Sequence, residues 1–112
     1  MRISKMFLPL FAAGLLASSA AYAGTGGGNV TSVVAIKGGT VVFKTATHTG
    51  YPICEEAPTE AWAIDTTTVN GKAQYALLLT AINSGMDITV AGTNTCDIYP
   101  TRETVQQLIV NY

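Results

Sequence analysis

One amphipathic helix, flanked on both sides by segments that favour β-strand, most constrains how this chain can fold. The helix is predicted over Asn70 to Gly85, where Asn70 can cap the first turn and Gly85 can take the left-handed conformation just past the end. Its apolar residues recur three and four positions apart, which marks one face for burial. That face consists of Tyr75, Leu78, Leu79 and Ile82. We therefore expect a sheet with one helix inserted late in the order.

The first 23 residues have the pattern of a Sec-type signal peptide. Arg2 and Lys5 supply positive charge, a short apolar run follows, and the triplet Ala21-Tyr22-Ala23 is a small-x-small cleavage site. The apolar run is too short to span a membrane, and no stop-transfer pattern follows it. We expect cleavage after Ala23, which predicts an exported chain, periplasmic or secreted, with no membrane span in its mature part.

The mature chain is long enough for one domain. Residues 24–28 read GTGGG and predict a flexible start, and residues 29–112 predict the domain itself. Loss of the leader leaves four of the 6 Lys and Arg residues against 7 Asp and Glu, so the formal net charge moves from −1 to about −3. Nucleic-acid binding and attachment to anionic lipid both require clustered basic residues, so we expect neither.

Cys54 and Cys96 are the two cysteines of the chain, and export favours a disulfide between them. A bridge closing a loop of roughly 43 residues would restrict the unfolded chain by about 4 kcal/mol on the loop-entropy model. The alternative is a metal site or a catalytic thiol. The chain has no CxxC motif and one histidine, His48, so the disulfide is favoured.

Five strands are predicted from alternating and β-branched residues. They span residues 29–37, 40–45, 60–65, 87–91 and 103–112. The first two flank the turn Gly38-Gly39 and should form a hairpin. The last keeps its apolar residues on one face only if a bulge near Gln106-Gln107 shifts its register. Residues 45–59 contain Gly50, Pro52 and Pro58 and are predicted to be irregular.

The resulting order is three strands, a helix and two strands. This is the order of the OB-fold, a small five-stranded Greek-key barrel, and closure would hide the strand edges of a short chain. The fold class predicted is therefore mainly β with one helix, as an OB-like barrel. The alternative is an open α+β sheet with the helix on one face.

Groups able to carry catalysis are few in this sequence. His48 falls in the irregular segment, no GxSxG motif is present, and we interpret this histidine as a solvated loop residue. Glu55 and Glu56 are interpreted as two solvated loop charges, because glycosidase carboxylates face each other across a cleft. We predict no enzymatic activity, no metal site and no cofactor.

The candidate ligand-binding residues are Tyr51, Tyr99, Trp62 and His48. Tyr51 and Tyr99 each lie in a loop beside a proline and within three residues of a cysteine. A disulfide would bring both tyrosines to one end of the barrel, where they could stack on sugar rings or contact a partner. The alternative is that they pack over the disulfide. Trp62 is also a candidate for the core of the third strand.

The outer face of the predicted helix is small and uncharged, although exposed helices usually carry Lys and Glu there. It consists of Ala73, Ala76, Leu77, Thr80 and Ser84. Such a face suggests contact with another surface, and we predict a homo-oligomer. The alternative is a helix that lies over the mouth of the barrel with this face in solvent.

The segments GKAQYALLLTAINSG, ITVAGTNTC and ETVQQLIV, after a signal peptide, resemble those of small exported bacterial proteins of unassigned function. The topology is also similar to that of the B subunits of AB5 toxins, including the subtilase-cytotoxin and pertussis-like branches. Those subunits are disulfide-stapled OB-folds that form rings and bind host glycans. This likeness is one of topology alone, and it carries no contact residue over.

The function predicted is that of an exported, non-enzymatic binding domain whose partner is a glycan or another envelope protein. Small hydrolase, inhibitor and structural envelope protein are the alternatives. An inhibitor would project a rigid loop, and residues 45–59 are the segment available for it.

Overall fold

The computed structural model describes residues 23–56 and 59–112 of the chain. The predicted signal peptide lies outside the described residues except for Ala23. The elements are β1 (Thr25–Ile36), β2 (Thr40–Thr49), β3 (Ala61–Asp65), α2 (Val69–Ser84), β4 (Asp87–Gly92) and β5 (Glu103–Asn111). This confirms a mainly β chain with one helix, in the predicted order.

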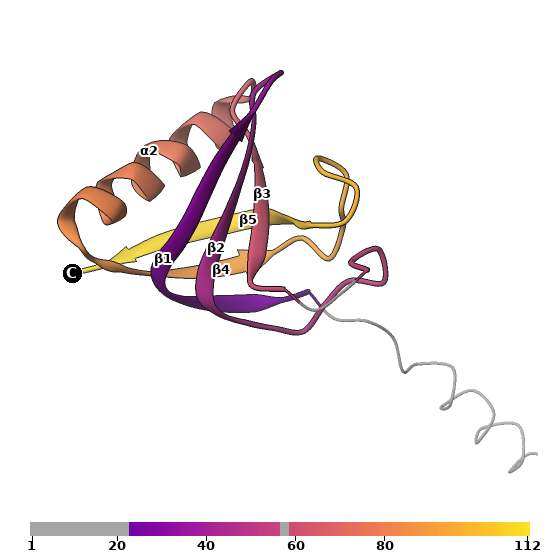
Figure 1. The fold of residues 1–112 in the computed structure, drawn as a ribbon, viewed down its shortest axis with the longest axis horizontal. Helices are drawn as coiled ribbons and strands as arrows, with labels where there is room; N and C mark the ends of the chain where they lie inside the picture. Colours follow the sequence, from indigo (N-terminus) through magenta and orange to yellow (C-terminus); the bar gives the residue numbers. More distant parts are fainter. Residues whose placement is uncertain (1–22, 57–58) are drawn as a thin grey trace, which may run out of the picture.

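The five strands close into a ring in the order β1-β2-β3-β5-β4, with β4 paired back to β1 (Figure 1). All neighbours are antiparallel except β3 and β5, which run parallel with Trp62 opposite Glu103. The helix lies to one side of the strands and reaches the core through Leu78 and Ala81. Because β4 pairs with β1, the sheet is not the open one of the predicted alternative.

The ring closes at the glycine-rich start of β1. Thr25 to Gly28 pair with β4 on one side, and Thr25 to Gly27 pair with β2 on the other. A side chain at Gly27 would run into the backbone carbonyl of Ile88, so the missing Cβ lets β4 approach this closely. The prediction of a flexible start at residues 24–28 is therefore wrong, because the glycines make close strand pairing possible here.

The predicted hairpin is confirmed, and its strands are longer than expected. Ile36 pairs with Thr40 around the turn, and Gly38 and Gly39 have φ angles of 100° and 96°, which glycine adopts without strain. Strand β2 continues to Thr49, so residues 45–49 are strand rather than the irregular segment predicted. They continue because the glycine-rich half of β1 supplies their pairing partners.

The helix begins and ends at capping residues. Thr68 is the N-cap, with its Oγ1 accepting from the Gly71 amide at 2.9 Å, and this replaces the predicted Asn70 cap. Asn70 lies within the first turn, since the turn that follows Asp65 brings the chain into helical conformation earlier. Gly85 takes the predicted left-handed conformation, with φ at 68°.

The buried face of α2 differs from the predicted one. Gly71, Leu78 and Ala81 are buried, while Leu79 and Ile82 are 39% and 41% exposed. Helix α2 approaches the sheet so closely at Gly71 that an added Cβ would overlap the carbonyl of Asp65. Gly71 and Ala81 therefore turn toward the sheet together with Leu78, and two of the four residues predicted for the buried stripe face outward.

The core fills the ring and the space under α2. Its buried members are Val41, Phe43, Trp62, Ile64, Leu78, Ala81, Ile88, Val90, Val105 and Leu108. The indole Nε1 of Trp62 donates to Thr45 Oγ1 at 3.0 Å, which satisfies its one polar atom inside the core.

The predicted bulge in β5 is confirmed, because Ala91 pairs with Gln107 and Gly92 with Val105, which leaves Gln106 unpaired. Tyr112 lies past the end of β5 and is fully exposed, so it does not share the strand's inner face.

The predicted disulfide is confirmed. Cys54 and Cys96 are bridged with their Cα atoms 6.0 Å apart, and they join the loop after β2 to the loop after β4. Within the described residues, no helix is long and apolar enough to cross a membrane.

Candidate functional site

A fully buried carboxylate stands at the start of β5. Glu103 is 0% exposed, and both of its oxygens accept hydrogen bonds. The Gly24 amide lies 2.9 Å from Oε2 and 3.2 Å from Oε1, and the Asn94 amide donates to Oε2 at 2.9 Å. His48 Nε2 lies 3.1 Å from Oε1. Backbone from two distant segments and one side chain therefore surround this carboxylate.

Two glycines make the space that Glu103 occupies. A side chain on Gly92 would overlap the carboxyl group of Glu103, and one on Gly24 would overlap Glu103 Oε1, His48 Nε2 and the carbonyl of Gly50. The Glu103 side chain therefore fits only because these two backbone positions carry no Cβ.

His48 lies at the end of β2 and is 5% exposed, so its interpretation as a solvated loop residue is wrong. Its ring stacks on Trp62, with centroids 3.7 Å apart and planes 11° from parallel. The Tyr51 hydroxyl donates to the His48 carbonyl at 2.7 Å. The position of the ring follows from the extension of β2, which places His48 inside the barrel end rather than in a loop.

Glu55, in the loop after β2, is the third member of this buried cluster. It is 9% exposed, and its Oε2 accepts from the amide and the hydroxyl of Thr59, both at 3.3 Å. The interpretation of Glu55 as a solvated charge is therefore wrong, while Glu56 is exposed as expected. The loop buries Glu55 because the disulfide at Cys54 holds the segment against the barrel.

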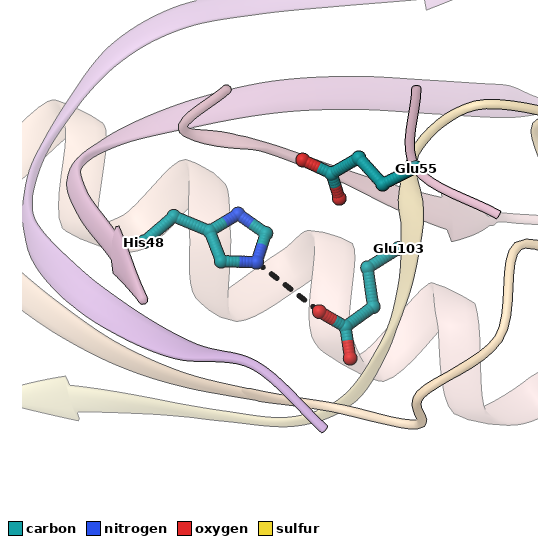
Figure 2. Close-up of side chains that lie close together, drawn as sticks. All are labelled: His48, Glu55 and Glu103. Atoms are coloured by element: carbon teal, nitrogen blue, oxygen red, sulfur yellow. Dashed lines mark hydrogen bonds and ion pairs between the residues drawn. The ribbon is translucent and has the colours of Figure 1, made fainter. Parts of the chain in front are cut away.

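His48, Glu55 and Glu103 each offer a ligand atom within 4.8 Å of the others, which is the arrangement of a three-residue metal site (Figure 2). His48 Nδ1 and Glu55 Oε1 have no hydrogen-bond partner among the described residues. Both oxygens of Glu103, in contrast, already accept from backbone amides. Those amides and His48 hold the Glu103 carboxylate in place, which gives the cluster a structural role.

The second polar region is an open pocket of ≈ 380 Å³ between the start of α2, the loop after β4 and the start of β5. Its lining is mostly polar. The residues are Asp65, Thr68, Asn70, Gly71, Gln74, Thr93, Asp97, Ile98, Thr104, Val105 and Gln106. No histidine, cysteine, serine or lysine is among these residues.

Threonines fix both carboxylates of the pocket. The hydroxyls of Thr104 and Thr95 donate to Asp97 Oδ1 at 2.6 and 2.9 Å, and these two bonds lower the pKa of Asp97 below its ordinary value. The hydroxyl and the amide of Thr67 donate to Asp65 Oδ1 at 2.6 and 2.9 Å and lower the pKa of Asp65 in the same way. Both groups are therefore ionised at neutral pH.

A smaller and more apolar groove of ≈ 180 Å³ lies over the outer side of β1 and β2. Val34, Ile36 and Val42 form part of its floor, and Tyr99 and Arg102 stand beside it. This is where the predicted candidate Tyr99 is placed.

The four predicted ligand residues do not form one site. Trp62 is 0% exposed, and His48 stacks on it inside the barrel end. Tyr51 is half-buried on His48, and its pKa is raised first by burial and then by the charges of Glu55 and Glu60. Tyr51 therefore stays protonated and donates to the backbone carbonyl of His48, whereas Tyr99 borders the groove.

Sequence reasoning missed the residues that form both regions. Glu103 was assigned only to a strand, and Gly24 only to a flexible start. Asp97 and Asp65 showed no motif spacing. The threonine-rich stretch from Thr93 to Thr104 was the available sign, since threonine hydroxyls beside an aspartate can fix its carboxylate.

No family model matches this chain, and no curated protein or solved structure was found to be similar to it.

Proposed function

We propose that the chain is an exported binding domain without catalytic activity, and that it binds a hydroxyl-rich ligand such as a glycan in the open pocket. The observation that carries this proposal is the pocket lining, where fixed carboxylates, side-chain amides and hydroxyls surround ≈ 380 Å³. Carboxylates accept and amides both donate and accept, so together they match the hydroxyl groups of a sugar ring.

The charge state of the pocket supports binding over hydrolysis. A glycosidase needs one carboxylic acid whose pKa is raised, so that it can protonate the leaving oxygen. Hydrogen bonds lower the pKa of Asp97 and of Asp65, so neither carboxyl holds a proton near neutral pH. Both are acceptors only.

The strand order β1-β2-β3-β5-β4, with the helix between the third and fourth strands, supports an OB-like barrel. A similar topology in AB5 toxin B subunits accompanies glycan binding, which adds to the proposal as an analogy of fold. The predicted export and the Cys54–Cys96 bridge are consistent with a chain that works outside the cytoplasm.

Exposed aliphatic residues on α2 support self-association. The predicted outer face of Ala73, Ala76, Leu77, Thr80 and Ser84 is exposed, and Leu77, Leu79 and Ile82 are each about two-fifths exposed. We expect light scattering at tens of micromolar to give an oligomer mass for the mature chain. Thr80→Glu should return it to a monomer, because an unpaired charge in a contact costs several kcal/mol. A monomer mass for the unaltered chain would remove this part of the proposal.

One exposed side chain favours a protein ligand as the second candidate. Ile53 precedes Cys54 in the stapled loop and is 88% exposed, which is the presentation expected of an inhibitor or partner loop. Binding of an envelope protein that depends on Ile53 and not on the pocket would favour this alternative.

A glycan array probed with the mature chain tests the main proposal. Asp97→Asn should weaken the binding of any ligand found by roughly tenfold or more, since hydrogen bonds to charged groups contribute about 1.5–3 kcal/mol. The matched control is Asp87→Asn, which removes the same charge from an exposed position outside the pocket lining. Equal binding by both variants, or hydrolysis of the glycan, would contradict the proposal.

A further inference from the structure

We propose that removal of the leader creates a buried ion pair, in which the new α-ammonium group of Gly24 binds the carboxylate of Glu103. The inference depends on the predicted cleavage after Ala23 and is independent of the proposed ligand. It concerns what the buried cluster does, since the open pocket does not use it.

The geometry places the nitrogen of Gly24 on the carboxylate. That nitrogen is buried with Glu103 and lies within hydrogen-bond distance of both oxygens, at 2.9 and 3.2 Å. In an uncleaved chain it is a peptide N–H with one hydrogen to share between two acceptors. After cleavage it is an ammonium with three hydrogens, so both oxygens can be satisfied by separate bonds.

A positive charge beside the Glu103 carboxylate would help to balance the buried carboxylates of the cluster. Glu103 and Glu55 are two buried carboxylates, and the only ion pair among the described residues is that of His48 with Glu103. Even if His48 were protonated, its single positive charge could not balance two carboxylates. Buried charges without partners are costly, and an ammonium on Gly24 would place a positive charge within hydrogen-bond distance of both oxygens of Glu103.

The space around residue 24 fits a chain terminus that has no side chain. A Cβ on Gly24 would overlap Glu103 Oε1, His48 Nε2 and the carbonyl of Gly50. The strand that follows is held by β2 and β4 from Thr25 onward, so the nitrogen is fixed rather than free to leave. The barrel end is thus built around the first residue of the predicted mature chain.

A consequence follows for export. While the leader is attached, the amide of Gly24 carries no charge, and the cluster lacks the ammonium group. The chain gains its full stability only once the leader has been removed, so the precursor remains easier to unfold than the mature protein.

The test begins with the full 112-residue chain exported from a bacterium and cleaved there. Mass spectrometry should give Gly24 as the first residue. A variant with Thr-Ser inserted between Ala23 and Gly24 should be cleaved ahead of the insertion, which turns the nitrogen of Gly24 back into an amide. Its melting temperature should fall by at least about 10 °C, because breaking a buried ion pair is strongly destabilising in a small domain. The matched control carries Thr-Ser after Tyr112, which is fully exposed, and should melt like the unaltered protein.

The same insertion in a Glu103→Gln background tests whether the loss of melting temperature comes from the broken ion pair or from steric crowding by the inserted residues. The insertion should then cost little, since the carboxylate that the ammonium binds is gone. An equal loss of melting temperature in both backgrounds, no loss in the first, or a first residue other than Gly24 would overturn the proposal.

A second measurement needs no variant and applies if Glu103→Gln does not fold. An amine-reactive reagent at neutral pH should label the α-amino group of the folded mature protein at least about tenfold more slowly than that of the protein in urea, because the group is buried in the folded state. The exposed Lys37 and Lys72 serve as internal standards. Equal labelling of the α-amino group in both states would overturn the proposal.

Discussion

The buried cluster around Glu103 and the open pocket around Asp97 each depend on a carboxylate that the chain holds with hydrogen bonds. They differ in whether a carboxylate oxygen remains free of hydrogen bonds from the chain. Both oxygens of Glu103 are used, and the residue is 0% exposed. Asp97 is exposed, and both threonine hydroxyls donate to Oδ1 without using Oδ2. A carboxylate that is fully used holds chain segments together, and one with an oxygen to spare can bind a ligand.

The segments joined at Glu103 are far apart along the chain. Gly24 precedes β1, His48 ends β2, and Asn94 follows β4, so one side chain connects four parts of the ring. At Asp97 the two donors are two and seven residues away. The first arrangement closes the barrel end, whereas the second shapes one loop.

The largest expected effect separates these two roles. Glu103→Ala should lower the free energy of unfolding by about 5 kcal/mol, at the upper end for loss of a buried charge partner, because it leaves His48, the Gly24 nitrogen and the Asn94 amide unpaired. Chemical denaturation of the mature chain measures this. Asp97→Ala is the matched comparison and should cost less, about 1–2 kcal/mol, because it removes two hydrogen bonds from threonine hydroxyls within one loop region. Similar losses in the two variants would show that the distinction drawn between these carboxylates is false.

Much of the fold could be predicted because it depends on local patterns. Alternating apolar residues predicted the strands, and Gly38-Gly39 predicted the hairpin turn. In the last strand the alternation shifts by one residue, which predicted the bulge found at Gln106. The phase of the helix could not be predicted in the same way. Leu79 and Ile82 are bulkier than Gly71 and Ala81, yet Gly71 and Ala81 are buried beside Leu78. At Gly71 the carbonyl of Asp65 lies too close for any side chain. The spacing of large apolar residues along a helix does not predict how closely that helix will pack against a sheet.

The candidate site was harder to predict, because its residues meet only after the ring has closed. His48 and Glu103 are 55 residues apart, and Gly24 and Glu103 are 79 apart. A glycine-rich start is typical of a flexible segment, and nothing in its composition shows that a neighbouring strand will pass within contact distance. A lone glutamate at the start of a strand likewise gives no sign of burial. The disulfide was different, since two cysteines in a chain predicted to be exported allow one internal pair.

The smallest expected effect tests how the open pocket fixes its acceptor. Thr104→Val keeps the shape of a buried residue and removes the hydroxyl that contributes most to lowering the pKa of Asp97. The pKa of Asp97 should therefore rise toward its ordinary value of 3.8, as measured by an NMR titration of the carboxyl carbon. Because the folded-state pKa of Asp97 is lowered, its contribution to stability is present above the unfolded value and is lost as the pH falls through the folded one, so the variant should begin to lose it at a higher pH. Thr95→Val is the matched comparison and should raise the pKa of Asp97 less, while Asp65 should titrate unchanged in both variants. An unchanged Asp97 in Thr104→Val would mean that the threonine does not hold the carboxylate, and the pocket would lose the fixed acceptor on which glycan binding is proposed.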